Sequence, residues 1–160
     1  MNEGNPVHVL IFKSYLQTIL NSTGSKVFRN LYALVNGKEQ DILNDGELSC
    51  AYFVSHILLM FSLITEGHAT VRGTVNDLMD SGWKVIDQPR TGAILVWEAS
   101  VTDDEGQLHD HIGFYIGDDQ AVSNSTTKRI PQEHFWTFAH EGKEDYRKVT
   151  AIFWNETLES

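Results

Sequence analysis

The chain contains a single cysteine, Cys50, three prolines among 160 residues, and no run of lysine or arginine. One thiol excludes an internal disulfide framework and a cysteine-rich zinc ribbon. The 22 acidic residues outnumber the 12 basic residues and give a formal net charge of −10. A nucleic-acid backbone or an anionic membrane surface is a poor partner for that charge, so we expect no nucleic-acid partner.

Long hydrophobic runs are missing as well. The longest apolar stretch, Ile57 to Ile64, is far shorter than the ~20 residues that span a bilayer. The first eight residues lack a basic segment, and no small-residue cleavage site follows them. We therefore expect a soluble protein without membrane insertion or a recognisable signal peptide, which is cytoplasmic or exported by a non-standard route.

Length and composition predict one globular domain. A chain of 160 residues that is 41% hydrophobic and 21% charged is neither of low complexity nor fully disordered. We treat residues 1–160 as a single domain with three parts. These are an N-terminal helical part (1–45), a central region that carries the candidate site (46–130) and a C-terminal strand region (131–160).

The first half has helical signals. Asn5 and Pro6 are typical of an N-cap and a first helical position, and Gly67 and Gly82 are typical helix ends. The segment after Ser49 is apolar on almost every side, which predicts a helix that is buried all round. The expected helices run from Asn5 to Asn21, from Phe28 to Val35, from Ser49 to about Ile64, and from Thr70 to Ser81.

The second half has strand signals: short apolar runs separated by turn residues. The expected strands are Ala93–Trp97, His111–Ile116, Ala121–Asn124, Lys128–Pro131 and Val149–Trp154. The acidic stretch at 103–105 is interpreted as a solvated hairpin loop. Helices followed by strands predict an α+β fold in which the buried cysteine helix packs on an antiparallel sheet.

Cys50 stands at the predicted start of the buried helix. Free backbone N–H groups and the positive end of the helix dipole favour a thiolate there and lower its pKa. A nearby histidine then forms a thiolate–imidazolium pair, the activated nucleophile of cysteine hydrolases. The alternative interpretation is a small core residue, because free cysteine is among the most buried residue types.

His111 is the natural partner because it opens an apolar strand directly after a charged loop, where a histidine is well held and still faces a cleft. A surface histidine at a loop edge is the alternative. His109 and His111 also share one face of a strand, which suits zinc, with Cys50, His134 or His140 as a third ligand. We favour solvated histidines over this metal site, since no further metal motif supports it.

The aromatic cluster at 134–138 has two interpretations. It lines a substrate cleft, or it covers a sheet face as part of the core. We favour the core, because large aromatic side chains dominate protein cores.

Four segments resemble the NlpC/P60 superfamily, a papain-like group with CHAP-like relatives. Glu47–Val54 resembles the cysteine box that begins that family's central helix. Gly92–Trp97 and His111–Gly117 resemble two of its strands, the second with a "His-Val-Gly-Ile-Tyr-Leu-Gly" pattern, and Gln120–Ser125 resembles the next strand. The order and spacing agree over about residues 45–130.

The resemblance implies a papain-like fold and a cysteine peptidase or amidase without a cofactor, acting on a peptide or amide substrate such as a bacterial cell-wall peptide. It implies that Cys50 attacks a carbonyl carbon and that His111 takes and returns the proton. The family's third residue, a polar group that orients the histidine, falls at Ser123, or at Asn124 if the strand register shifts by one.

Some positions depart from the family pattern. Ser49 stands where aspartate is common, and Ala51 and Tyr52 stand where the family has Ser-Gly. The bulky Tyr52 would narrow the groove or alter its substrate. The neutral hydroxyl of Ser123 supports an imidazolium less than a carboxylate does. A catalytically weak or inactive binding or scaffold domain is therefore the second functional hypothesis.

Overall fold

The computed structural model describes residues 4–102 and 108–160. Within these residues lie helices α1 (Ile11–Ser22), α2 (Cys50–Met60) and α3 (Val71–Asp80) and the 3₁₀ helix η1 (Glu156–Glu159). The strands in the same residues are β1 (Tyr32–Val35), β2 (Lys38–Asp41), β3 (Lys84–Val85), β4 (Ile94–Thr102), β5 (Leu108–Gly117), β6 (Gln120–Asn124), β7 (Pro131–Phe135) and β8 (Val149–Trp154). The predicted α+β class is confirmed. The acidic loop expected at 103–105 lies outside the described residues.

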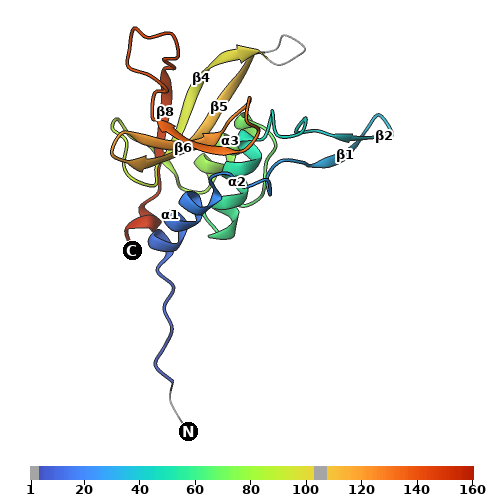
Figure 1. The fold of residues 1–160 in the computed structure, drawn as a ribbon. Helices are drawn as coiled ribbons and strands as arrows, with labels where there is room; N and C mark the ends of the chain where they lie inside the picture. Colours follow the sequence, from blue (N-terminus) through green and yellow to red (C-terminus); the bar gives the residue numbers. More distant parts are fainter. Residues whose placement is uncertain (1–3, 103–107) are drawn as a thin grey trace.

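The main sheet holds six of the described strands, in the order β3-β8-β4-β5-β6-β7, and every neighbouring pair is antiparallel. The helices lie together on one side of it (Figure 1). β8, the last strand along the chain, lies between β3 and β4. β5, β6 and β7 follow one another both along the chain and across the sheet, so side chains from these three strands lie close together.

Helix α2 is buried against the sheet, as its apolar composition predicts. Phe53 is fully buried and meets Phe114 of β5 edge-on, with ring centroids 5.4 Å apart. The helix ends at Met60 rather than near Ile64, because Ser62 adopts a positive φ of 55° that breaks the helical path. Among the described residues, no helix has both the length and the apolar composition to cross a membrane.

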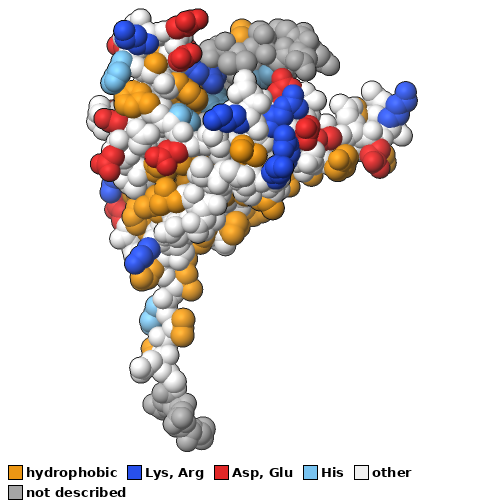
Figure 2. Space-filling model, viewed as in Figure 1, with side chains coloured by type: hydrophobic (Ala, Val, Ile, Leu, Met, Phe, Trp, Pro, Cys, Tyr) orange, Lys and Arg blue, Asp and Glu red, His pale blue; other side chains and the backbone are white. Residues whose placement is uncertain are grey.

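The expected start of the first helix at Asn5 is wrong. Residues 4–10 have no regular structure, and α1 begins only at Ile11. Val7 is 91% exposed and Val9 is 67% exposed, and the segment extends away from the body of the protein (Figure 2). Most helical stability in proteins comes from packing, and this segment has none.

The helix expected at 28–35 is also wrong. Tyr32–Val35 forms β1, which pairs with β2 in a two-stranded sheet that projects from the body (Figure 1). Asn36 and Gly37 join the strands, with positive φ angles of 50° and 78°. That pair is typical of a two-residue hairpin turn. Tyr32, expected on the buried face of a helix, is 65% exposed.

Two smaller differences concern strands. The short strand expected at 128–131 begins only at Pro131, because Arg129 adopts a positive φ of 62° and its N–H bonds the Ser125 carbonyl in a turn. The two-residue strand β3 carried no apolar run and was not predicted; it is held by pairing with β8.

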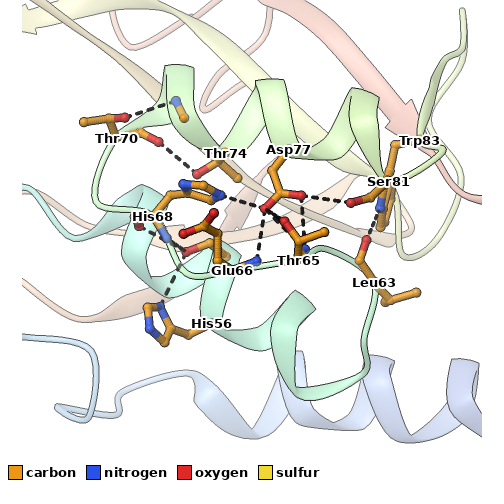
Figure 3. A network of polar contacts seen from close by, with 12 residues as sticks. His56, Leu63, Thr65, Glu66, His68, Thr70, Thr74, Asp77, Ser81 and Trp83 are labelled. Atoms are coloured by element: carbon orange, nitrogen blue, oxygen red, sulfur yellow. Dashed lines mark hydrogen bonds and ion pairs between the residues drawn. The ribbon is translucent and has the colours of Figure 1, made fainter.

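Asp77 of α3 ties that helix to the loop that follows α2 (Figure 3). Its carboxylate accepts hydrogen bonds from the N–H groups of Thr65 and Glu66, both at 3.1 Å. The Ser81 hydroxyl donates at 2.8 Å, and Nε2 of His68 lies 2.7 Å away. Although burial alone raises the pKa of Asp77, the bonds from His68, Thr65 and Ser81 hold it well below its usual range.

Candidate active site

Cys50 is the first residue of α2 and is half-buried. Ser49, at the N-cap position, makes no side-chain capping bond, so the N–H groups of the first turn stay available. The N–H groups of Ile112 on β5, of Ala51 and of Cys50 itself lie close enough to the sulfur to lower the pKa of the thiol. The sulfur therefore lies beside the strand that carries His111.

The expectation of a lowered thiol pKa at Cys50 is wrong. Burial raises this pKa by more than the N–H groups of Ile112 and Ala51 and the charge of Arg147 lower it. The helix start favours a thiolate, but removing the sulfur from water opposes the charge more strongly. The resting thiol is therefore neutral rather than half of an ion pair.

His111 is buried on β5, with Nε2 2.9 Å from the hydroxyl oxygen of Ser123 on β6. Asn124, the other candidate for the third position, donates from Nδ2 to the Gly46 carbonyl at 2.7 Å. Successive residues of a strand point to opposite faces of the sheet. The structure therefore brings Ser123 to His111 and leaves Asn124 on the opposite face.

His134 on β7 extends this contact into a chain of hydrogen bonds. The Ser123 hydroxyl oxygen lies 2.7 Å from Nε2 of His134, and Nδ1 of His134 lies 2.8 Å from the Phe135 carbonyl oxygen. A carbonyl only accepts, so Nδ1 of His134 carries hydrogen and Nε2 accepts from the Ser123 hydroxyl. The Ser123 oxygen then accepts from Nε2–H of His111, which leaves the lone pair of His111 on Nδ1.

Aromatic rings enclose the two histidines. Trp97 lies 5.3 Å from His111, and Phe138 stacks on His134 at 4.0 Å, both measured between ring centroids. Burial and the nearby charge of Arg147 hold the pKa of His111 well below its usual range, and burial lowers the pKa of His134. Both imidazoles are therefore neutral near pH 7, as the assigned hydrogen bonds require.

Gly113 provides the space in which Ser123 approaches β5. A Cβ at this position would lie 2.7 Å from the Cβ of Ser123 and 2.7 Å from the Val122 carbonyl oxygen. Such contacts are closer than packed atoms tolerate, so only glycine leaves both strands in place.

A cavity of about 690 Å³ opens beside the hydrogen-bonded chain. Its walls include the polar side chains just described, together with an aromatic ring and a cation: His111, Ser123, His134, Phe138 and Arg147. Cys50 is not part of this wall, and its sulfur lies instead at the N–H of Ile112. The cavity offers room for a ligand next to the His111 ring.

The metal site considered for His109 and His111 does not assemble. In the part of the chain that the structure describes, no group of three or more histidine, cysteine or carboxylate side chains is placed to hold a metal ion. Of the third ligands considered, His134 uses both ring nitrogens in hydrogen bonds, and the exposed His140 packs against Phe135.

Two residues of this site were not assigned to it from the sequence. His134 was considered as a metal ligand and as part of an aromatic cluster that either lines a cleft or, as we favoured, belongs to the core. Strand alternation places it with Ser123 only once the pairing of Ala121 with His134 is known. Arg147 lies in an irregular segment without periodicity. In comparisons with known proteins, no protein-family model matches the chain and no curated protein matches it.

Proposed function

We propose that this protein is a thiol hydrolase that cleaves an amide or peptide bond, built on a papain-like fold of the NlpC/P60 type. Cys50 is the nucleophile, His111 is the general acid and base, and Ser123 orients His111. The observation that supports this best is the hydrogen-bonded chain from His111 through Ser123 and His134 to the Phe135 carbonyl. No cofactor takes part.

The chain of hydrogen bonds matters because a general base needs an unprotonated nitrogen aimed at the proton that it removes. With Nε2–H donated to Ser123, the lone pair of His111 is on Nδ1. This is the tautomer control that the third residue exerts in catalytic triads. Here a hydroxyl backed by His134 replaces the usual carboxylate or second histidine.

The reaction begins with a neutral pair. As the Cys50 sulfur bonds to the carbonyl carbon, the thiol proton moves to Nδ1 of His111, and the N–H of Cys50 donates to the oxyanion. The C–N bond then breaks, and the amine leaves with the proton from His111. Water adds to the thioester, gives its proton to His111 and releases the acid, and the sulfur regains the proton.

The sequence resemblance, which lies in the residues around Cys50 and His111, favours cell-wall peptides as the substrate class. The second candidate function is a binding or scaffold domain that keeps the fold without turnover. The raised pKa of the Cys50 thiol favours this second candidate, because a neutral thiol is a poor nucleophile unless a base removes its proton.

Alkylation by iodoacetamide separates the two candidates without a known substrate. If His111 acts as the base, wild-type Cys50 reacts at pH 7 roughly tenfold faster than Cys50 in His111→Gln, since general-base assistance typically exceeds that factor. Equal rates in the two proteins would favour the scaffold. Mass spectrometry of the labelled peptide measures the rates.

Turnover is then measured on bacterial cell-wall muropeptides and on a mixed peptide library, by the release of new amines. Cys50→Ala is the matched control, because it removes the sulfur with little change in burial. Release that persists in Cys50→Ala would exclude Cys50 as the nucleophile.

A further inference from the structure

Arg147 lines the same cavity as His111 and Ser123, and among the described residues its side chain makes a single hydrogen bond. Its Nη2 donates to the Glu98 carbonyl oxygen at 2.9 Å, while its Nε is buried without a hydrogen-bond partner. The ring of Phe138 lies 5.3 Å from the guanidinium carbon. One face and one edge of the guanidinium are therefore fixed by the protein.

No carboxylate of the described residues forms an ion pair with Arg147. Glu98 contacts Nη2 of Arg147 only through its backbone carbonyl. Its carboxylate accepts a hydrogen bond from the N–H of Lys148 at 3.2 Å. A guanidinium has five N–H donors in a planar fork that matches a carboxylate. The guanidinium is influenced by the charges of Glu98 and Asp110, but no carboxylate of the described residues lies within ion-pair distance of it, so the fork is open to a carboxylate that enters the cavity beside His111.

We propose that Arg147 binds a carboxylate of the substrate, so that the protein acts on amides and peptides that carry a free carboxylate close to the bond that is cleaved. That the ligand is a substrate rests on the proposed hydrolase. The carboxylate site itself rests on the cavity and on the N–H groups of Arg147 that have no acceptor among the described residues. Such a ligand would form two parallel N–H···O bonds with the fork.

Binding of an anion there would also assist the chemistry. The charge of Arg147 lies close enough to disfavour protonation of His111, and attack by Cys50 requires His111 to become protonated. A carboxylate on Arg147 offsets that charge. Substrates with the carboxylate therefore gain in kcat as well as in binding, whereas neutral analogues meet a less basic His111.

The carboxylate site is tested first by NMR, with N-acetylglycine and its neutral analogue N-acetylglycinamide added to the wild-type protein. The Nε–Hε resonance of Arg147, assigned by its loss in Arg147→Gln, should shift in a saturable way with N-acetylglycine alone. Equal shifts with both compounds, or none with either, would overturn the proposal.

A second measurement compares the alkylation of Cys50 by iodoacetate and by iodoacetamide, which differ only in carboxylate against amide. The rate with iodoacetate divided by the rate with iodoacetamide should fall roughly tenfold in Arg147→Gln, in line with the strength of hydrogen bonds between charged groups. Arg72→Gln, on the exposed face of α3, removes the same charge and should leave the ratio unchanged. If both reagents slow equally in Arg147→Gln, the arginine only stabilises the thiolate, and the proposal fails.

The two measurements separate this inference from the proposed function. If Cys50 is reactive and the Arg147 resonance does not move with N-acetylglycine, the carboxylate site is rejected and the proposed hydrolase stands. If Cys50 is inert to both reagents and the Arg147 resonance moves with N-acetylglycine, the proposed hydrolase is rejected and the carboxylate-binding site stands.

Discussion

Ser123 is a single hydroxyl between two neutral imidazoles, and it serves both because a hydroxyl donates and accepts at once. Ser123→Ala removes both bonds and frees His111 to adopt the other tautomer. We expect kcat/KM to fall about 100-fold, near the lower end of what general acid–base catalysis contributes. The iodoacetamide rate at Cys50 should fall with it.

The neighbouring Asn124→Ala is the control for that experiment, because it breaks a bond to Gly46 on the opposite face. If Asn124→Ala slows alkylation as much as Ser123→Ala does, the orienting role belongs to the strand as a whole and not to the hydroxyl.

His111 also links stability to pH. Its pKa in the folded protein lies well below 6.5, because of burial and the charges of Arg147 and His134, whereas in the unfolded chain it lies near 6.5. Between these two values the unfolded chain binds more protons, so stability is fully present above about pH 6.5 and is lost as the pH falls toward the folded pKa. His111→Gln should flatten this dependence in urea unfolding between pH 7.5 and 4.5. A wild-type protein that gains stability on acidification relative to His111→Gln would contradict it.

At the scale of secondary structure, the close pairing of β5 with β6 depends on Gly113. In Gly113→Ala the new methyl group would meet the backbone of Val122 and the Cβ of Ser123, both at 2.7 Å. We expect a loss of about 1–3 kcal/mol of unfolding free energy, as for other overpacked sites, together with slower alkylation of Cys50. Gly4→Ala meets nothing within 4 Å and is the control. Unchanged stability in Gly113→Ala would mean that the two strands are less closely packed than the structure has them.

Asp77 makes the junction between α2 and α3 sensitive to acid. Its folded pKa is depressed by His68, Thr65 and Ser81, so its contribution is present above the unfolded value near 3.9 and is lost as the pH falls below it. In Asp77→Asn one accepting oxygen becomes a donor, which should cost about 1–3 kcal/mol at pH 7. Denaturation between pH 5 and 2 should show a weaker pH dependence in the variant than in the wild type.

The elements that the sequence predicts correctly are those with one dominant local signal. The all-round apolar helix after Ser49 is one, and the short apolar runs at 93–97, 111–116 and 149–154 are others, each overlapping a strand of the sheet. The hairpin at 32–41 was missed because its apolar residues also have helical spacing, and the turn at Asn36 decides between the two.

The site was predictable only as far as the chain order allowed. Cys50, His111 and Ser123 were proposed from the resemblance, and the structure brings Ser123 to His111. His134 was not, because its place beside Ser123 depends on the register between β6 and β7, which no local pattern encodes. The direction in which the pKa of the Cys50 thiol shifts was missed for a related reason. The start of the helix is visible in the sequence, but the depth at which the sulfur is buried is not.

At the scale of the whole molecule, the N-terminal segment contributes little to the fold. Residues 4–10 are exposed and lie outside every helix and strand, and only the Leu10 carbonyl takes part in the first turn of α1. Deletion of residues 4–8 should leave the Tm within about 2 °C, because these residues are exposed and their loss removes no buried area. Differential scanning calorimetry measures this, and a larger drop would show that the segment packs on the body in solution.

The position of β8 between β3 and β4 has a consequence for biosynthesis. β8 is the last of the described strands to be synthesised, so the edge of β4 that pairs with it stays open until residues 149–154 have left the ribosome. Helix α2 and its partner strand β5 are both made before β8, so the contact between Phe53 and Phe114 forms while that edge is still open. The nascent sheet therefore passes through a stage in which β4 offers unpaired backbone N–H and C=O groups, the kind of edge that pairs with other chains.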